Sequence, residues 1–300
     1  MERFLKDVLV FLSVLLVVSM AADFIYSRLF SNNTTANVAI WKDVMDGQAS
    51  SDLLFLGDSM VNNDCFPPVI DSITRLKSYA AGILGQHFSL ERLRYDMYRR
   101  YNDKPSVLVQ FVDGWIFREP SQYDRSQFFP WMWNRAFRKR AFELEPRYFS
   151  PQIPWYRYHN EHFFDKAASK VRPYRGFFTY WNYTFSRWQE KSLFLKENQR
   201  NERLFRSFLS DVLNDGIKVV LVQAPICGSL SFKDSTLASI RERFGSIAEE
   251  YGIPFLDYLQ RPVYEDSTLF IDSVHLNKKG AEMFSDSLAN DLISLGLIKL

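Results

Sequence analysis

The sequence predicts an α/β fold in which helices cover both faces of a parallel sheet. Short apolar runs rich in Val, Leu and Ile recur along the chain, and segments with apolar residues at helical spacing lie between them. Turn residues such as Asn214-Asp215-Gly216 separate the two kinds of segment. Successive parallel strands need a crossover between them, so this alternation indicates a parallel sheet. With 300 residues, of which 47% are apolar, the chain can bury a sizeable core.

Five strands are expected where apolar residues run together. The first contains Leu53-Leu54-Phe55-Leu56, four large apolar residues in a row, which is typical of a strand buried on both faces. Pro67 lies in the first turn of the following helix, where its missing N–H costs nothing. We expect strands at residues 53–57, 77–82, 106–112, 216–225 and 253–258, and helices at residues 38–45, 67–73, 88–101, 201–216, 235–252 and 277–295.

The N-terminal segment has the pattern of a signal sequence or a signal anchor. Arg3 and Lys6 precede an uncharged apolar stretch, residues 8–22, which Asp23 ends. This stretch is shorter than the roughly 20 residues that span a bilayer, and residues 24–26 can extend it at the interface. The positive charges before the stretch predict that the rest of the chain lies outside the cytoplasm.

Three interpretations of this segment stay open. An uncleaved transmembrane anchor is the one we favour. Ser19-Met20-Ala21 has small residues at both flanking positions and is a candidate cleavage site. A buried N-terminal helix is disfavoured because the stretch offers no polar face. We therefore divide the chain into an anchor (1–30), a polar stalk with a short helix (31–50) and one domain (51–300) with an insertion at about 113–195.

Charge and cysteine content bear on the class of protein. The net charge of +2 is too small to indicate a nucleic-acid partner. Cys65 and Cys227 each follow a predicted strand end. In an exported protein these two residues can form a disulfide, and two free thiols in or near the core are the other interpretation.

Residues 113–195 interrupt the alternation and hold six of the seven tryptophans. We expect a mostly helical or irregular insertion here. It is open whether it forms a second small core, a platform that stacks sugars, or a surface that docks a membrane partner, because aromatic rings suit all three. His159, His162 and Asp165 stand at helical spacing, but without a third strong ligand they predict no metal site.

Two short motifs carry the residues of serine chemistry. Gly57-Asp58-Ser59 directly follows the first strand, at the edge of the sheet where open α/β folds bind ligands. Asp272 and His275 stand three residues apart before the last helix. A serine nucleophile needs a base within hydrogen-bond reach, and the base needs an orienting carboxylate. This placement predicts Ser59 as nucleophile, His275 as base and Asp272 as its orienting group. A turn serine and a surface histidine are the alternative.

These motifs resemble blocks of the SGNH, or GDSL-type, hydrolase superfamily. The Gly-Asp-Ser motif resembles the first block, and residues 272–280 resemble the last, which completes the triad. Residues 79–85, YAAGILG, look like the second block. The resemblance implies a flavodoxin-like three-layer α/β/α sandwich, a serine esterase activity, and an oxyanion hole formed by the backbone N–H groups of Ser59 and Gly85. It covers residues 51–112 and 216–295 and leaves the insertion unexplained.

The third block departs from the family pattern. The family often has Gly-x-Asn-Asp after the third strand, and the Asn donates to the oxyanion, whereas here Asp113 follows and no Asn is found. A carboxylate repels an oxyanion, and loss of one donor costs roughly 100- to 1000-fold in rate. Asn62, Asn63 and His87 are candidate substitutes, although each has an ordinary loop or helix-start role as its commoner interpretation. The substrate-pocket candidates are therefore Asp58, Asn62, His87 and Asp113.

The plan of the chain is similar to that of membrane-anchored SGNH proteins that work beside membrane-bound O-acyltransferases in bacterial envelopes. This resemblance implies an extracytoplasmic O-acyl esterase or O-acyltransferase, with acetyl as the expected group, that acts on envelope or exported polysaccharide without a cofactor. The alternative is a weak or inactive scaffold that binds a glycan or a membrane acyltransferase. The missing Asn favours the scaffold, and the intact Ser59, Asp272 and His275 favour the enzyme.

Overall fold

The structure is a computed structural model, and it divides into two compact units that we describe separately. The first comprises residues 1–38 and 124–171, and the second comprises residues 39–123 and 172–300. The residues that the structure describes are 1–30, 36–117, 126–146, 175, 177, 198–227, 234–259 and 261–299. Residues 31–35 of the expected stalk and the spaced His159, His162 and Asp165 lie outside these ranges.

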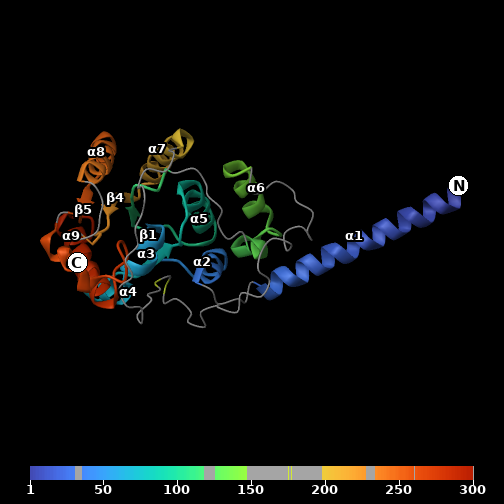
Figure 1. The fold of residues 1–300 in the computed structure, drawn as a ribbon, viewed down its shortest axis with the longest axis horizontal. Coiled ribbons are helices and arrows are strands. Elements are labelled where there is room, and N and C mark those ends of the chain that lie inside the picture. Colours follow the sequence, from blue (N-terminus) through green and yellow to red (C-terminus); the bar gives the residue numbers. More distant parts are fainter. Residues whose placement is uncertain are drawn as a thin grey trace. The chain divides into compact units, whose positions relative to one another are not determined.

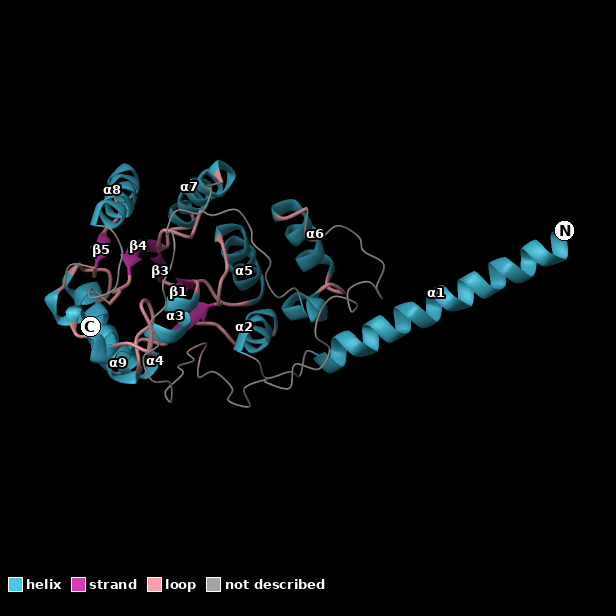
Figure 2. Ribbon diagram, in the orientation of Figure 1, coloured by secondary structure: helices cyan, strands magenta, loops and turns pink. Residues whose placement is uncertain are grey.

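A five-stranded parallel sheet forms the centre of the second unit, as the alternating pattern predicts (Figure 2). Its strands lie in the order β2-β1-β3-β4-β5, the flavodoxin-like order. Each strand begins and ends within about two residues of its predicted bounds. The strands are β1 (Leu53–Gly57), β2 (Ser78–Gly82), β3 (Val107–Phe111), β4 (Lys218–Gln223) and β5 (Phe255–Asp257).

Helices cover both faces of this sheet, so the second unit has three layers (Figure 1). The chain runs from β1 out to β2 and then crosses back over β1 to β3. Because parallel crossovers are right-handed, this reversal sends the helices before and after β2 to opposite faces. One face carries α3 (Ser59–Asp64), α4 (Pro67–Thr74) and α9 (Lys278–Ser294), and the other carries α5 (Phe88–Tyr101), α7 (Gln199–Asn214) and α8 (Asp234–Tyr251).

The reversal makes a topological switch point between β1 and β3, where helices leave neighbouring strands toward opposite faces. Leu53 pairs with Val107 and Leu56 with Gln110, so the two strands run side by side up to their carboxyl ends. In open α/β sheets the crevice beyond such a point is where ligands bind. The fold therefore brings the residues that follow β1 and β3 to one place.

The core of the second unit comes from the apolar strands and the helix faces on either side. Leu53, Phe55 and Leu56 have no exposed side-chain surface, as their continuous apolar run predicts. Helix α2 (Ala36–Met45) forms where the short helix is expected, and its Trp41 is fully buried. Both cysteines are buried free thiols, so the disulfide alternative is not formed. Burial raises the pKa of the Cys65 thiol above its usual value.

The first unit contains the N-terminal helix and part of the aromatic insertion. Helix α1 (Glu2–Phe30) is long and apolar enough over residues 2–25 to cross a membrane. Its apolar side chains are exposed along most of its length, so it is not a buried core helix. Two helical elements of the insertion are described, the 3-10 helix η1 (Ser126–Trp131) and α6 (Arg135–Leu144), which agrees with the expected helical character.

Candidate active site

Ser59 lies where β1 ends and α3 begins. The carboxylate of Asp58 caps α3 by accepting the N–H of Met60 at 2.9 Å, so the N-cap is Asp58 and the Ser59 hydroxyl is left for another partner. Glycine is required at position 57 because α3 packs closely against the end of β1. A Cβ at this position would lie 2.7 Å from Cγ2 of Val61. Each residue of Gly57-Asp58-Ser59 thus has a local role. Gly57 allows close packing, Asp58 caps α3, and the Ser59 hydroxyl can bond to a residue elsewhere in the fold.

Asp272 and His275 occupy one tight turn before α9. Oδ1 of Asp272 accepts the backbone N–H groups of Val274 and His275 at 2.9 and 2.8 Å. Its Oδ2 lies 2.7 Å from Nδ1 of His275. The backbone N–H of Ile271 donates to the carbonyl oxygen of His275 at 2.9 Å and closes the turn. The carboxylate is therefore fixed by the backbone and orients the imidazole ring.

The imidazole of His275 reaches the hydroxyl of Ser59. Its Nε2 lies 2.8 Å from Oγ of Ser59, across 216 residues of sequence. Since Asp272 accepts from Nδ1–H, Nε2 is left as the acceptor for the serine hydroxyl. The structure thus brings together the three residues that the two motifs single out, in the geometry that proton transfer requires.

The charges around this chain of hydrogen bonds favour an imidazolium. Burial alone lowers the pKa of His275, but the hydrogen bond and charge of Asp272 together with the charge of Asp64 raise it above its usual value. Burial also raises the pKa of Asp272, yet hydrogen bonds from His275 and Val274 hold it below its usual range. Asp272 is therefore ionised when His275 accepts a proton.

Asp64 is a buried carboxyl beside this turn that the sequence analysis did not single out. It is the last residue of α3, and its Oδ1 accepts the N–H of Leu276 at 2.9 Å. Burial raises its pKa to about 8, against the opposing charge of His275. Its Oδ2 has no hydrogen-bond partner among the described residues. The signal in the sequence is the polar run Asn62-Asn63-Asp64 directly after the nucleophile motif.

The turn that carries Gly85 lies between β2 and α5. Gly85 has a φ of +67°, in the left-handed region that favours glycine. The buried guanidinium of Arg94 joins this segment to the nucleophile strand, since it donates to Oε1 of Gln86 and to the carbonyl oxygen of Gly57, the latter at 2.6 Å. Burial lowers the pKa of Arg94 to about 10, so it stays charged at neutral pH.

The three candidate substitutes for the missing amide donor are buried within the fold. Asn62 and His87 have no exposed surface, and His87 is the residue that precedes α5. The amide of Asn63 donates to the carbonyl oxygen of Ser59 itself at 2.8 Å. The ordinary structural role therefore describes Asn63 better than a role at the oxyanion.

Asp113 lies at the carboxyl end of β3, across the switch point from Ser59. Its Oδ1 accepts the N–H groups of Trp115 and Ile116, both at 2.7 Å, so it shapes the turn after the strand. Its carboxyl also forms a hydrogen bond with that of Asp58. Burial, with the charges of Asp113 and Glu91, raises the pKa of Asp58 well above its usual range. Two of the four pocket candidates, Asp58 and Asp113, thus form a carboxyl pair, and Asp58 directly precedes Ser59.

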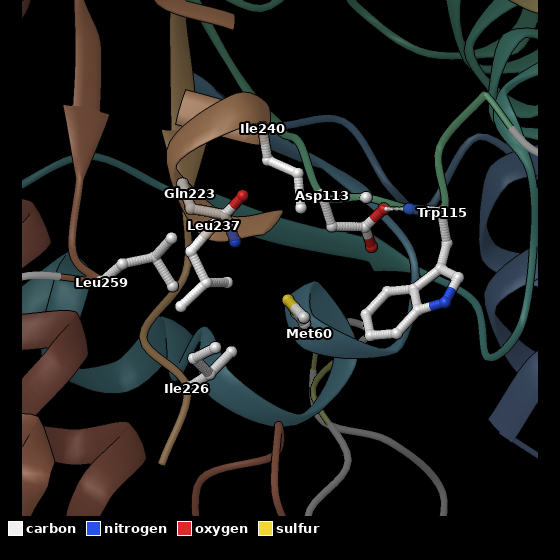
Figure 3. A pocket seen from close by; sticks show the side chains of 9 residues that line it. Met60, Asp113, Trp115, Gln223, Ile226, Leu237, Ile240 and Leu259 are labelled. Carbon is white, nitrogen blue, oxygen red and sulfur yellow. Dashed lines mark hydrogen bonds between the residues drawn. The ribbon is translucent and has the colours of Figure 1, made fainter. Parts of the chain in front are cut away.

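An apolar pocket opens beside Met60, the residue after Ser59 (Figure 3). It is partly open to solvent, and the centre of a water-sized sphere can occupy about 10 Å³ of it. Asp113 and Gln223 contribute its polar groups, and Figure 3 shows Met60 between Trp115 and the apolar side chains after β4 and β5. The lining residues are Met60, Asp113, Gly114, Trp115, Gln223, Ile226, Leu237, Ile240 and Leu259.

This pocket is joined to the turn that carries the base. The residue after Ile226 is Cys227, and its backbone N–H donates to the carbonyl oxygen of Ser273 at 3.0 Å. Ser273 lies between Asp272 and His275 in the sequence. The pocket wall therefore adjoins Ser59 through Met60, and it adjoins the turn of Asp272 and His275 through this backbone hydrogen bond.

Solved structures that match this chain share little sequence with it. A protein from Desulfitobacterium hafniense, proposed to be a lipolytic member of the G-D-S-L family, is 13% identical, with a TM-score of 0.44 over 79% of this chain and 97% of that one. The acetyl xylan esterase AlAXEase is 13% identical, with a TM-score of 0.43 over 81% and 98% of the two chains. Comparison of the sequence with protein-family models and with curated proteins gave no match. The geometry of the site therefore carries the functional proposal.

Proposed function

We propose that the protein is a serine-dependent O-acyl esterase or O-acyltransferase that acts on acylated carbohydrate through an acyl-serine intermediate. The observation that carries the proposal is the continuous chain of hydrogen bonds from Ser59 Oγ to His275 Nε2, at 2.8 Å, and from His275 Nδ1 to Asp272, at 2.7 Å. These residues have the roles of nucleophile, general base and orienting carboxylate.

The reaction follows from this geometry. Oγ of Ser59 attacks the carbonyl carbon of the acyl ester while its proton passes to Nε2 of His275, and Asp272 stabilises the imidazolium. The tetrahedral intermediate collapses when the bond to the sugar oxygen breaks and His275 returns the proton to that oxygen. Water or a second sugar hydroxyl then loses a proton to His275 and attacks the acyl carbon. The bond from that carbon to Oγ of Ser59 breaks, and His275 returns the proton to Oγ, which restores Ser59. These steps use only side chains of this chain and call for no cofactor.

The oxyanion hole is the less complete part of the proposed site. The backbone N–H groups of Ser59 and Gly85 are the donors that we assign to it. Arg94 supports this assignment, because it fastens the segment after Gly85 to the end of β1. Asp113 offers a carboxyl where an amide donor is usual, so we expect a slow enzyme rather than an efficient one.

We further propose that α1 is retained as a transmembrane anchor and that the second unit works outside the cytoplasm, with a membrane-bound O-acyltransferase as partner. The helix continues without a break through the candidate cleavage site Ser19-Met20-Ala21, which supports retention. Arg3 and Lys6 at its start support an orientation with the N-terminus inside. Envelope or exported polysaccharide is the substrate class that suits this location.

A scaffold without catalysis is the second candidate function. It is favoured by one observation, the carboxyl of Asp113 at the position where a donor to the oxyanion is expected. In that case the protein would hold a glycan or a membrane acyltransferase without breaking a bond.

One experiment separates the two functions. The full chain in detergent is incubated with a small acetyl ester, beside Ser59→Ala and His275→Ala variants, and the intact mass is measured during turnover. We expect an acetyl adduct on the wild type that Ser59→Ala does not form. Faster loss of the adduct with an added oligosaccharide indicates transfer. Equal inertness of all three proteins toward several acyl esters would favour the scaffold.

A further inference from the structure

The C-terminal end of α1 is covered by a tryptophan from the insertion. Nε1 of Trp133 donates to Oδ2 of Asp23 at 2.9 Å, and its ring meets that of Phe24 edge to face with centroids 5.6 Å apart. Asp23 is only 3% exposed, although most of α1 before it is open to the surroundings. The acid that ends the apolar stretch is therefore buried by the aromatic segment between η1 and α6.

The exposed face of α6 combines positive charge with aromatic surface. Arg135, Arg138, Lys139 and Phe142 recur at helical spacing and are exposed, whereas Phe137, Ala141 and Leu144 on the other side are buried. Phe142 is 47% exposed and Trp133 is 37% exposed. We call Trp133, Arg135, Arg138, Lys139 and Phe142 the collar.

Trp133 of the collar contacts α1 at the position where the hydrocarbon core of a bilayer would end. With a rise of about 1.5 Å per residue, 20 helical residues span the roughly 30 Å of a hydrocarbon core. A core that begins near Leu5 therefore ends near Phe24, which is the residue that packs against Trp133. Figure 1 draws α6 near this end of α1. Tryptophan is enriched at this depth, because its ring is apolar and its N–H is polar.

We propose that the collar lies on the outer surface of the bilayer that α1 crosses and binds anionic phospholipid headgroups. Exposed aromatic side chains enter the interface, and neighbouring arginine and lysine side chains meet the negative charge of the lipids. The bilayer is the occupant that continuity favours, since Trp133 is fastened directly to the end of the apolar helix. The proposal rests on α1 being an anchor, and it does not depend on the chemistry at Ser59.

The test measures the depth of a spin label on the full chain in lipid nanodiscs. The label is attached at Phe142→Cys, and a matched control carries it at Lys279→Cys, on the exposed surface of α9 in the second unit. The native cysteines are buried, so the wild type is the blank for unwanted labelling. Discs of phosphatidylcholine alone are compared with discs that also contain phosphatidylglycerol.

We expect the label at position 142 to report headgroup depth in the anionic discs, from its collision rates with oxygen and with a water-soluble nickel complex. The label at position 279 should report water in both discs. Replacing Arg135, Arg138 and Lys139 by Gln should remove the difference between the two discs, because each cation near an anionic surface changes occupancy by about fivefold.

Three results would overturn the proposal. The label at position 142 could report water in both discs, or it could be shielded from both quenchers regardless of lipid, which would indicate a protein contact. The intact mass of the purified chain could also lack residues before Asp23. None of these results depends on whether Ser59 forms an acetyl adduct. Failure of the proposal that the collar binds lipid can therefore be distinguished from failure of the proposed activity.

Discussion

The carboxyl ends of β1 and β3 carry the same residue type and use it differently. After β1, Asp58 caps α3, and Ser59 is left with a hydroxyl 2.8 Å from His275. After β3, Asp113 closes the turn to Trp115 and Ile116 and brings a carboxyl to the site. In the proposed site, hydrogen bonds therefore join all the groups needed for proton transfer, whereas a carboxyl lies where a donor to the oxyanion is expected.

The largest expected effect on the rate comes from replacing the serine that follows β1. Ser59→Ala removes the nucleophile and leaves its helix cap in place, because Asp58 provides the cap. We expect ester hydrolysis to fall by roughly 10⁴-fold or more, since the groups of such a triad act as a unit. The measurement is kcat/KM on an acetyl ester, with thermal unfolding as the control for folding. Activity within tenfold of the wild type would exclude Ser59 as the nucleophile.

A smaller loss is expected from the residue that orients the base. Asp272→Asn places an amide beside Nδ1 of His275 and favours the tautomer in which Nε2 carries the proton. The rate should fall by roughly 10³- to 10⁴-fold, with little change in KM. Steady-state kinetics against pH will check this, and Asp272→Glu is the matched variant that keeps the charge. If Asp272→Asn keeps the wild-type kcat, the turn serves structure alone.

A substitution at the end of β3 is expected to raise the rate rather than lower it. Asp113→Asn keeps an oxygen for the N–H groups of Trp115 and Ile116 and supplies an amide donor in place of a carboxyl. We expect kcat to rise by about tenfold, because a donor replaces a repulsive group near the developing oxyanion. Asp113→Ala is the control, since it loses the turn and should melt at a lower temperature without a gain in rate.

A fall in rate for Asp113→Asn would reverse this interpretation. It would indicate that the carboxyl itself takes part, through its hydrogen bond with Asp58. Asp58 after β1 and Asp113 after β3 would then act together as one functional carboxyl pair.

The last expected effect concerns the free energy of unfolding and involves Asp64, the last residue of α3. The pKa of Asp64 is about 8 in the folded protein, against an ordinary value near 4 in the unfolded chain. The folded state therefore holds a proton that the unfolded state releases, and this contribution to stability is full below about pH 4 and is lost as pH rises to about 8. Asp64→Asn cannot lose that proton.

We accordingly expect the wild type to lose about 3 kcal/mol of unfolding free energy relative to Asp64→Asn between pH 5 and pH 8. Denaturation of the full chain in detergent at the two pH values measures the difference. Parallel pH dependence of the two proteins would show that Asp64 is ionised in the fold or that its burial is relieved by water.

Much of the fold, and the two short motifs that the fold brings together, could be predicted because local sequence specifies them. The apolar run before Ser59 determines a buried strand, and Asp272 closes its own turn by accepting the N–H groups of Val274 and His275. The role of Asp64 could not be predicted, because its burial depends on α9 and on a turn more than 200 residues away in the sequence. Strand ends shifted by one or two residues, since the hydrogen bonds of the neighbouring strand decide where a strand stops.

The amide of Asn63 illustrates the same limit. The sequence suggests a donor for the oxyanion, but the helix geometry directs this side chain to the carbonyl oxygen of Ser59. A residue type and its nearness in sequence indicate which chemistry is available. Only the packing decides which partner each group has.

The distance along the chain between Ser59 and His275, 216 residues, has a consequence for biosynthesis. During synthesis from the N-terminus, Ser59 leaves the ribosome long before His275. Until residues 272–275 emerge and α9 docks, Ser59 has no imidazole beside it and is an ordinary alcohol. On the proposed mechanism, a chain that stops before residue 272 should therefore form no acyl adduct on Ser59.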